Sequence, residues 1–346
     1  MIMKIHKIFI KVLLLNLIFA ITYTTNSLFG MSFNSRRTYR STSPCTRLYF
    51  GKTPKLRALP DNFYFDTFLG KDPVYQIGQL LYGEEFTAQA LSENEIFLKG
   101  SSGTGGVISP ANLQRIAAPI NQQNHGTLEV VVSDVHASCM NQGFREVLQL
   151  PMGSTLFVED GNNPQYFQFI HPEGAFQTML LISKNSVTEI NKLKQLDEHS
   201  LRSMAVSQAE KLLGIPFQWG GQSAFERCGF DCAGLIHTAY RSCAKIISRD
   251  VAALFRKTAE IDSSNLQPGD LVFAGQPIGL NKNDVRIDHV LLYAGNDELI
   301  EASPQTGLCE KTTCTKLFGK SINLLKNGDV VPAFDEEYLI FFRSIF

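Results

Sequence analysis

A cysteine stands at the start of a predicted helix in the segment Gly-Phe-Asp-Cys-Ala-Gly-Leu-Ile, residues 229–236. A turn-forming glycine and Asp231 precede Cys232, and small and apolar residues continue the helical pattern to Tyr240. A thiol at this position lies beside the positive end of the helix dipole and beside unpaired backbone N–H groups, which favour the thiolate. We therefore expect Asp231 to cap the helix or support the turn, and Cys232 to be a reactive nucleophile.

A histidine opens a strand-like apolar run further along the chain, in Asp-His-Val-Leu-Leu-Tyr, residues 288–293. His289 follows all other histidines of the chain, and together with Cys232 it supplies the minimal pair of a thiol nucleophile and its base. His237 lies in the same predicted helix as Cys232 but five positions further on, so it points to another side. We expect His237 to be structural.

The N-terminus has the pattern of a secretory signal. Lys4, Lys7 and Lys11 precede the short apolar core of residues 12–20, although no clean cleavage site follows. We expect residues 1–25 to be a signal peptide and the protein to be exported to the periplasm or cell envelope; an uncleaved membrane anchor is the alternative. The net charge of −1 and the absence of a long basic run disfavour nucleic acid as a partner.

Seven cysteines are too few for a disulfide-built scaffold in a chain of 346 residues. They form no paired Cys-x-x-Cys clusters with histidine, so we expect neither a metal nor another cofactor. Cys309 and Cys314 are close enough in sequence to pair in an oxidising compartment. A disulfide between Cys228 and Cys232 would silence the nucleophile, and the sequence leaves that pairing open.

The order of elements predicts an α+β protein with three parts. Short strands separated by turn residues fill 60–120 and again 125–192, a pattern typical of two small β-barrels, while residues 31–60 are typical of a linker or irregular lead-in. From Asp197 a helical pattern runs to Gly214, which we expect to end the helix. Strands near residues 270–273, 290–294, 299–302 and 338–342 then predict one antiparallel sheet, so the part at 196–346 has helices first and strands afterwards.

Four blocks in this C-terminal part resemble the NlpC-type cell-wall peptidases, which are papain-like cysteine enzymes. Residues 214–221 resemble G-x-P-Y-x-W-G-G, and residues 229–235 resemble G-F-D-C-S-G-L. Residues 266–273 resemble L-x-P-G-D-L-v-F, and residues 289–302 resemble H-V-x-x-Y-x-G-x-x-x-x-I-H-A. The resemblance implies a papain-like domain with helices packed on an antiparallel sheet, preceded by two barrels of the bacterial Src-homology-3 type.

The resemblance also implies an activity, that of an exported peptidoglycan hydrolase (a thiol protease) acting on stem peptides or muropeptides. Members that cleave short wall peptides carry Arg-Asp-Ser where this chain has Arg249-Asp250-Val251. There the aspartate binds the free amine of an N-terminal L-Ala, because a carboxylate is the natural partner of an ammonium group. The expected substrate bond is the γ-D-Glu to diamino-acid amide.

The catalytic group implied by the resemblance is Cys232, with His289 as base and Glu301 as the third member that orients the imidazole. Asp250, Trp219 and Asp231 are the candidate residues on the substrate side. Trp219 fits an aromatic wall of the cleft, with core packing as the alternative. We expect the oxyanion hole, which binds the negatively charged oxygen of the intermediate, to be formed by the Cys232 backbone N–H and a neighbouring donor.

Several positions depart from the family pattern. Phe217 replaces a tyrosine, Ala233 and Val251 replace serines, and Glu301 stands where a histidine is usual. These changes remove polar groups around the substrate but keep the nucleophile and base. Two alternatives to the endopeptidase therefore stay open: an N-acetylmuramoyl-L-alanine amidase with the same Cys/His pair, and a catalytically weakened peptidoglycan-binding protein.

Overall fold

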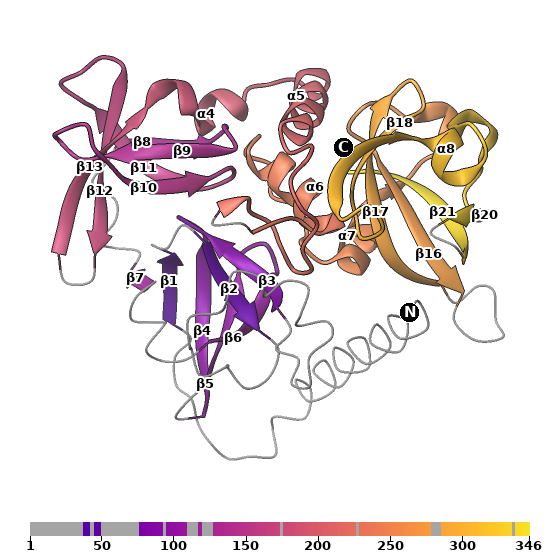
Figure 1. Cartoon of the computed structure of the whole chain (residues 1–346), viewed down its shortest axis with the longest axis horizontal. Helices are drawn as coiled ribbons and strands as arrows, with labels where there is room; N and C mark the ends of the chain where they lie inside the picture. Colours follow the sequence, from indigo (N-terminus) through magenta and orange to yellow (C-terminus); the bar gives the residue numbers. More distant parts are fainter. Residues whose placement is uncertain are drawn as a thin grey trace. The chain divides into compact units, whose positions relative to one another are not determined.

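The computed structural model describes residues 37–41, 45–49, 76–92, 95–108, 117–119, 127–173, 176–225, 228–277, 285–333 and 336–346. The chain divides into two compact units, residues 1–36 and 37–346, and all described residues lie in the second unit (Figure 1). The expected signal peptide at 1–25 lies outside the described residues. Among the residues that are described, no helix is long and apolar enough to cross a membrane.

The N-terminal part of the second unit forms a seven-stranded antiparallel sheet in the order β3-β2-β6-β5-β4-β1-β7. Its strands are β1 (Arg37–Ser41), β2 (Cys45–Tyr49), β3 (Gln76–Leu81), β4 (Glu85–Ser92), β5 (Glu95–Gly100), β6 (Gly105–Ile108) and β7 (Ala117–Pro119). Leu80, Phe86, Leu98 and Ile108 form its small buried core. The expectation of an irregular lead-in at 31–60 is wrong for β1 and β2, because both pair with later strands of this sheet.

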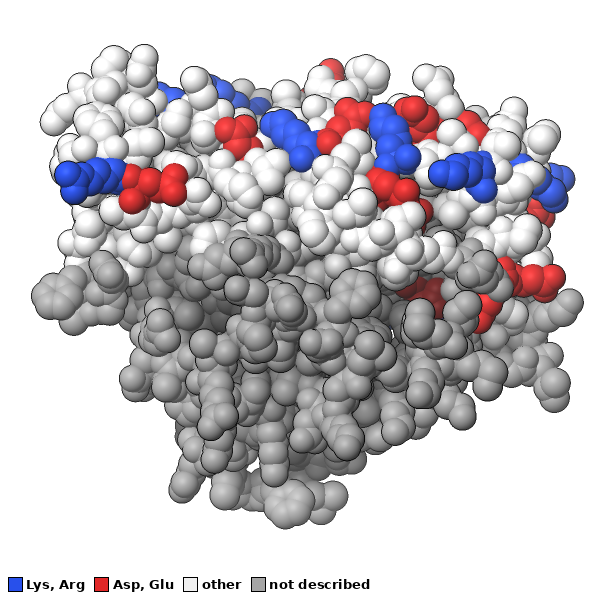
Figure 2. Space-filling view, in the orientation of Figure 1, with Lys and Arg blue, Asp and Glu red and all other residues white. Residues whose placement is uncertain are grey.

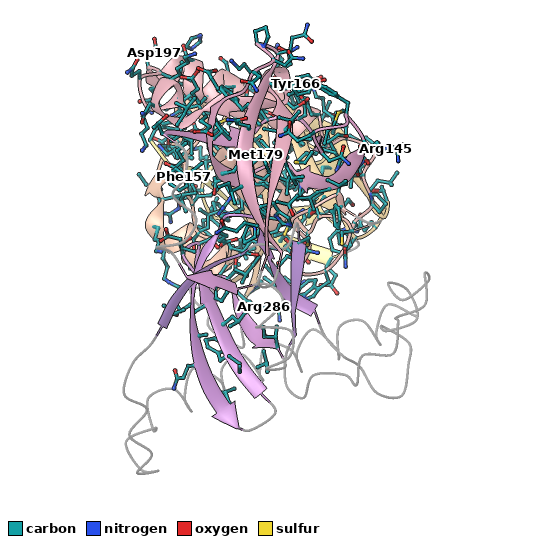
Figure 3. All side chains as sticks on the ribbon, turned by 90° about the vertical axis from the view of Figure 1, so that its left-hand side faces the viewer. Arg145, Phe157, Tyr166, Met179, Asp197 and Arg286 are labelled. Carbon is teal, nitrogen blue, oxygen red and sulfur yellow. The ribbon has the colours of Figure 1, made fainter. Side chains whose placement is uncertain are left out.

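A second seven-stranded antiparallel sheet follows, in the order β10-β9-β13-β12-β11-β8-β14. Its strands are β8 (Leu128–Val132), β9 (His136–Met140), β10 (Glu146–Pro151), β11 (Thr155–Asp160), β12 (Tyr166–Glu173), β13 (Phe176–Ser183) and β14 (Val187–Glu189), with the short helices η2 (Lys184–Ser186) and α4 (Ile190–Leu193). Val130, Val132, Leu180 and Ile182 are fully or almost fully buried in its core, at alternate positions of their strands. Figure 3 draws the side chains of this sheet, with Phe157, Tyr166 and Met179 labelled on β11, β12 and β13.

The C-terminal part is a mixed α and β unit. Its helices are α5 (Glu198–Glu210), α6 (Cys232–Arg241), α7 (Val251–Lys257) and α8 (Cys314–Phe318), with the 3₁₀ turns η4 (Ser263–Asn265) and η5 (Ile322–Leu324). Its strands are β15 (Ala259–Glu260), β16 (Leu271–Pro277), β17 (Val285–Gly295), β18 (Glu298–Ser303), β19 (Leu308–Thr313), β20 (Asp329–Ala333) and β21 (Glu336–Ser344). They form one antiparallel sheet in the order β15-β21-β16-β17-β18-β19, and β20 pairs with β21. The expected single antiparallel sheet is therefore confirmed.

Both faces of this third sheet are covered. One face, with Val290 and Leu292 of β17, packs against α5 and α6, and the opposite face, with Leu291, packs against α8 and η5. Because both faces are buried, β17 has a continuous apolar run instead of the alternation of a half-exposed strand. The sheet thus gives α6 a fixed support.

The helix that leads into the site begins after Asp197, but it ends before the expected Gly214, because its C-cap is Lys211. The Asp197 side chain caps α5 by accepting the Ser200 N–H at 2.7 Å, and this bond holds the pKa of Asp197 below its ordinary value. The helix ends at Glu210, and a turn carries the chain to Gly214, whose φ of 82° lies in the left-handed region that glycine tolerates. From Gly214 the chain turns into the loop that precedes α6.

Charged side chains are mixed in sign over the described surface that Figure 2 draws. Lys and Arg residues alternate there with Asp and Glu, and they do not gather into one basic patch.

Candidate active site

Cys232 is the first residue of α6, as the sequence predicted. Asp231 is its N-cap: Oδ1 accepts the Gly234 N–H at 2.7 Å, which satisfies one of the free donors of the first turn. Cys232 is a free thiol and is 8% exposed, so it lies at the edge of the core but is accessible. The thiol therefore lies at the positive end of the helix dipole, beside the N–H groups of the first turn.

His289 and Glu301 lie on the adjacent strands β17 and β18. The distance between His289 Nε2 and Glu301 Oε2 is 2.6 Å, and both side chains are buried. Since Nε2 is engaged by Glu301, Nδ1 is the ring nitrogen left for Cys232, to which the imidazole is also hydrogen-bonded. The geometry brings all three candidate catalytic residues into one group.

The electrostatics of this group favour a charged imidazole. Burial by itself lowers the pKa of His289, but the charge of Cys232 and the hydrogen bonds to Cys232 and Glu301 outweigh burial and raise that pKa well above its ordinary value. An imidazolium between a thiolate and a carboxylate can donate a proton to a leaving amine. The group can therefore perform acyl transfer through sulfur.

The other buried thiols lack this setting. Burial raises the pKa of Cys243, Cys309 and Cys314 to about 12, so they stay protonated at neutral pH. The open pairing of Cys309 with Cys314 does not occur, because both are free thiols, and they pack on opposite faces of the third sheet. The free thiol of Cys232 likewise excludes the silencing disulfide with Cys228.

Three glycines allow the loop of residues 216–222 to pack directly on α6. A Cβ at Gly234 would lie 1.9 Å from the Gly221 carbonyl oxygen, and one at Gly221 would lie 2.1 Å from the Gly229 carbonyl oxygen. One at Gly229 would lie equally close to the carbonyl oxygen of Pro216. Any side chain at these positions would push the loop away from the start of the helix. This close approach explains why both sequence blocks are rich in glycine.

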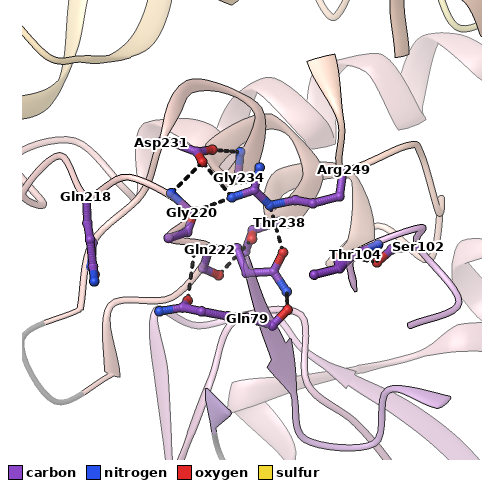
Figure 4. Close-up of polar contacts among 12 residues, drawn as sticks. Gln79, Ser102, Thr104, Gln218, Gly220, Gln222, Asp231, Gly234, Thr238 and Arg249 are labelled. Carbon is purple, nitrogen blue, oxygen red and sulfur yellow. Dashed lines mark hydrogen bonds and ion pairs between the residues drawn. The ribbon is translucent and has the colours of Figure 1, made fainter. Parts of the chain in front are cut away.

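Arg249 ties this loop to the helix cap, a role that the sequence reasoning missed. Its Nη2 donates to Asp231 Oδ2 at 2.8 Å and to the Gly221 carbonyl at 2.9 Å, and its Nε donates to Gln222 Oε1 at 3.0 Å (Figure 4). Asp231 Oδ2 also accepts the Gly220 N–H at 2.9 Å. Both Asp231 oxygens are thus bonded within the protein, which favours the capping role over contact with substrate. The only sequence signal for Arg249 was its place beside Asp250.

Asp250 and Trp219 lie at the margin of this network. Asp250 is exposed and caps α7, its Oδ1 accepting the Ala253 N–H at 2.7 Å. Trp219 is half-buried. Tyr82 is buried in the core of the second sheet, with its hydroxyl 3.3 Å from His171 Nδ1.

His237 is structural, as expected. It is fully buried in α6, and its Nδ1 lies 3.0 Å from the Ile247 carbonyl oxygen. Burial, with smaller effects of Arg241 and Arg249, lowers its pKa to about 3, so the imidazole is neutral. Within the described ranges, no group of three or more His, Cys, Asp or Glu side chains is arranged to hold a metal ion.

Comparisons with known proteins agree on the C-terminal part. Residues 214–326 match the NlpC/P60 family. The chain is 34% identical over 97 residues to a gamma-D-glutamyl-L-lysine dipeptidyl-peptidase of Bacillus cereus, and the aligned segment covers 28% of this chain and 27% of that protein. It is 38% identical over 107 residues to the murein DD-endopeptidase MepH of Escherichia coli, and the aligned segment covers 30% of this chain and 36% of that protein. The matched segments thus span about a third of these relatives or less.

A solved structure extends the likeness in fold to most of the chain. The NlpC/P60 family protein from Bacillus cereus aligns with a TM-score of 0.63 and 19% sequence identity, and the alignment covers 89% of this chain and 99% of that one. At this identity the likeness concerns the fold alone. Together with the family match and the four sequence blocks, it leads to one conclusion: residues 214–326 of this chain form an NlpC/P60 domain.

Proposed function

We propose that this protein is a cysteine peptidase that hydrolyses peptidoglycan stem peptides at the γ-D-Glu to diamino-acid amide bond. The observation that carries the proposal is the group of Cys232 at the N-terminus of α6 and the hydrogen-bonded pair of His289 and Glu301. The names of the two relatives, a gamma-D-glutamyl-L-lysine dipeptidyl-peptidase and a murein endopeptidase, support the substrate class.

The mechanism follows from the charges of this group. The Cys232 thiolate attacks the amide carbonyl carbon, and the negative charge passes to the carbonyl oxygen, which faces the N–H of Cys232 at the open first turn of the helix. His289 then gives its proton to the leaving amine, and an acyl-thioester remains on the enzyme. Neutral His289 next takes a proton from water, whose hydroxide attacks the thioester and restores the thiolate and the imidazolium. Glu301 holds the ring and stabilises its charged form.

The proposed specificity is for a free N-terminal L-Ala. Asp250 is exposed at the start of α7, directly after the buried Arg249 that binds the cap of the catalytic helix. A carboxylate in this place is suited to bind an ammonium group on the substrate. An amidase substrate has no free L-Ala amine, so Asp250 favours the endopeptidase over the amidase.

We also propose the domain organisation expected from the sequence. The first two sheets would be Src-homology-3-like barrels, and the part at 196–346 would be the peptidase domain. A signal peptide at 1–25 would export the protein to the envelope, where its substrate is found. Each of the two sheets has a buried apolar core of its own, which is consistent with small barrels.

A weakened peptidoglycan-binding protein is the second candidate, because Phe217, Ala233 and Val251 lack the hydroxyl groups that the family pattern has there. The test is mass analysis of the products from L-Ala-γ-D-Glu-diaminopimelate and from its lysine analogue. We expect release of the diamino acid by the wild type and none by Cys232→Ala. Binding of wall fragments without any cleavage would favour the second candidate, and release of L-Ala peptides from intact muropeptides would favour the amidase.

A further inference from the structure

A buried pair of glutamines is among the contacts between the first sheet and the catalytic part. Gln79 of β3 and Gln222, in the loop before α6, are both fully buried. The Gln222 N–H donates to Gln79 Oε1 at 2.8 Å, and Gln222 Nε2 donates to the Gln79 carbonyl oxygen at 2.7 Å (Figure 4). Gln79 thus accepts hydrogen bonds from both the backbone amide and the side-chain amide of Gln222.

Gln222 is bonded on its other sides to the groups that hold the nucleophile. Its carbonyl oxygen accepts the Thr238 hydroxyl of α6 at 3.0 Å, and its Oε1 accepts Arg249 Nε at 3.0 Å. Arg249 in turn binds Asp231, the cap of the helix that begins with Cys232. A continuous chain of hydrogen bonds therefore leads from β3 to Asp231, the N-cap of the helix that Cys232 begins. We name Gln79, Gln222, Arg249 and Asp231 the glutamine relay.

We propose that Gln79 is a positioning residue for Cys232, so that the first sheet is part of the catalytic unit and not a separable wall-binding module. The proposal rests on the proposed function of Cys232 and adds to it a residue that lies far outside residues 214–326. Gln79 does not touch the reacting atoms, and it acts through Gln222 and Arg249.

The physical reason is the cost of an unpaired buried amide. Without the Gln79 side chain, the buried Gln222 N–H loses its acceptor, and the loop must move to find another one. The loop cannot move alone, because Gly220 and Gly221 bind Asp231 and Arg249 and pack against the backbone at Gly234. A shift of Gln222 is therefore passed to the cap at Asp231, and the start of α6 moves relative to His289.

The test measures the thiolate directly, without any assumed substrate. Full-length Gln79→Met, which keeps the size of the side chain but has no acceptor, is alkylated with iodoacetamide across a pH series, and Cys232 is followed by peptide mass spectrometry. We expect alkylation about tenfold slower than in the wild type at neutral pH, and within about twofold at high pH, where the thiolate is fully formed. The matched control is Gln89→Met on β4, which makes the same change in the same sheet outside the relay. Its rate should equal that of the wild type.

A double-mutant cycle separates a relay from a general loss of stability. In a Gln222→Met background the side-chain link from residue 222 to Arg249 is already lost, so Gln79→Met should slow alkylation by a smaller factor than it does in the wild type. If Gln79→Met fails to fold, Gln222→Met interrupts the same pair from the catalytic side and must show the same pH-dependent loss. Additive effects, or an unchanged rate in folded Gln79→Met, would overturn the proposal. Slower alkylation in a protein whose wild type cleaves no stem peptide would refute the proposed function and leave the relay standing.

Discussion

The imidazole of His289 shares its Nε2 with the carboxylate of Glu301 at 2.6 Å, and both side chains are closed off from solvent. A carboxylate in this position does more than orient the ring, because it stabilises the charged imidazolium. Its effect adds to that of Cys232, so the raised pKa of His289 belongs to the whole group. This relationship extends the pH range in which the imidazole of His289 carries its charge.

Replacement of Glu301 by Gln should narrow that range from the alkaline side. The amide keeps a hydrogen bond to the ring but lacks the negative charge, so the pKa of His289 falls. The alkaline limb of the pH profile of stem-peptide cleavage should then move down by about one unit. The control is Glu310→Gln, at the half-buried residue that pairs with Glu301 across β18 and β19, which should leave the profile unchanged. An unmoved alkaline limb in Glu301→Gln would show that the carboxylate does not set the charge of His289.

Replacement of Asp250 by Asn separates substrate binding from helix capping. Asparagine caps a helix about as well as aspartate, so the bond to the Ala253 N–H and the stability should persist. The lost charge should raise KM about tenfold or more for peptides with a free N-terminal amine. Peptides with an acetylated N-terminus should be cleaved poorly by the wild type and no worse by the variant. Equal wild-type rates on free and acetylated peptides would remove the role of Asp250.

Replacement of Arg249 by Met should be strongly destabilising. It leaves the buried carboxylate of Asp231 without its ionic partner, at a cost of about 3 kcal/mol in the free energy of unfolding measured in urea. Arg249→Lys should recover only part of this loss, since one ammonium cannot make the three contacts of the guanidinium fork. The exposed Arg145 provides the control, and Arg145→Met should change the stability by less than about 0.5 kcal/mol.

His237 should make the protein sensitive to acid. Its pKa is about 3 in the folded state against an ordinary value of 6.5, so between these values the unfolded chain binds one more proton than the folded protein. Stability is therefore lost as the pH falls from 6.5 towards 3, by about 1.4 kcal/mol per pH unit from this group alone. His237→Asn keeps a donor for the Ile247 carbonyl and should flatten the decline, whereas substitution of the exposed His199 should not. Urea unfolding at pH 7 and pH 5 measures the difference.

Much of the fold could be predicted because its signals are local. The Asp231 cap, the start of α6 and the apolar run of β17 depend on neighbours in sequence, and all were found. The strands β1 and β2 were missed because they are held by pairing with β4 and β3, which lie further along the chain. Their own residues are largely polar and do not show the alternation of a strand. The short helices α7 and α8 escaped for a similar reason, since a cap and a few packed side chains define them.

The candidate site divides in the same way. Cys232, His289 and Glu301 were named from sequence because a resemblance to a family connects segments that are far apart in the chain. Arg249 was seen only as the neighbour of Asp250, although its guanidinium holds the loop to the helix cap. Gln79 gave no signal, since a glutamine in a strand is ordinary until its partner is known.

The sequence by itself predicted the candidate nucleophile, its candidate base and the α+β class, because the signals of a helix cap, of a strand and of the glycine spacing lie in consecutive residues. Only the tertiary structure decided that Glu301 is buried on His289, that Cys309 and Cys314 face opposite sides of a sheet, and that Gln79 is bonded to Gln222. The physical reason is burial: a hydrogen bond or a charge gains its strength from exclusion of water. Which residues lose their water is a property of the packed chain and not of any segment of it.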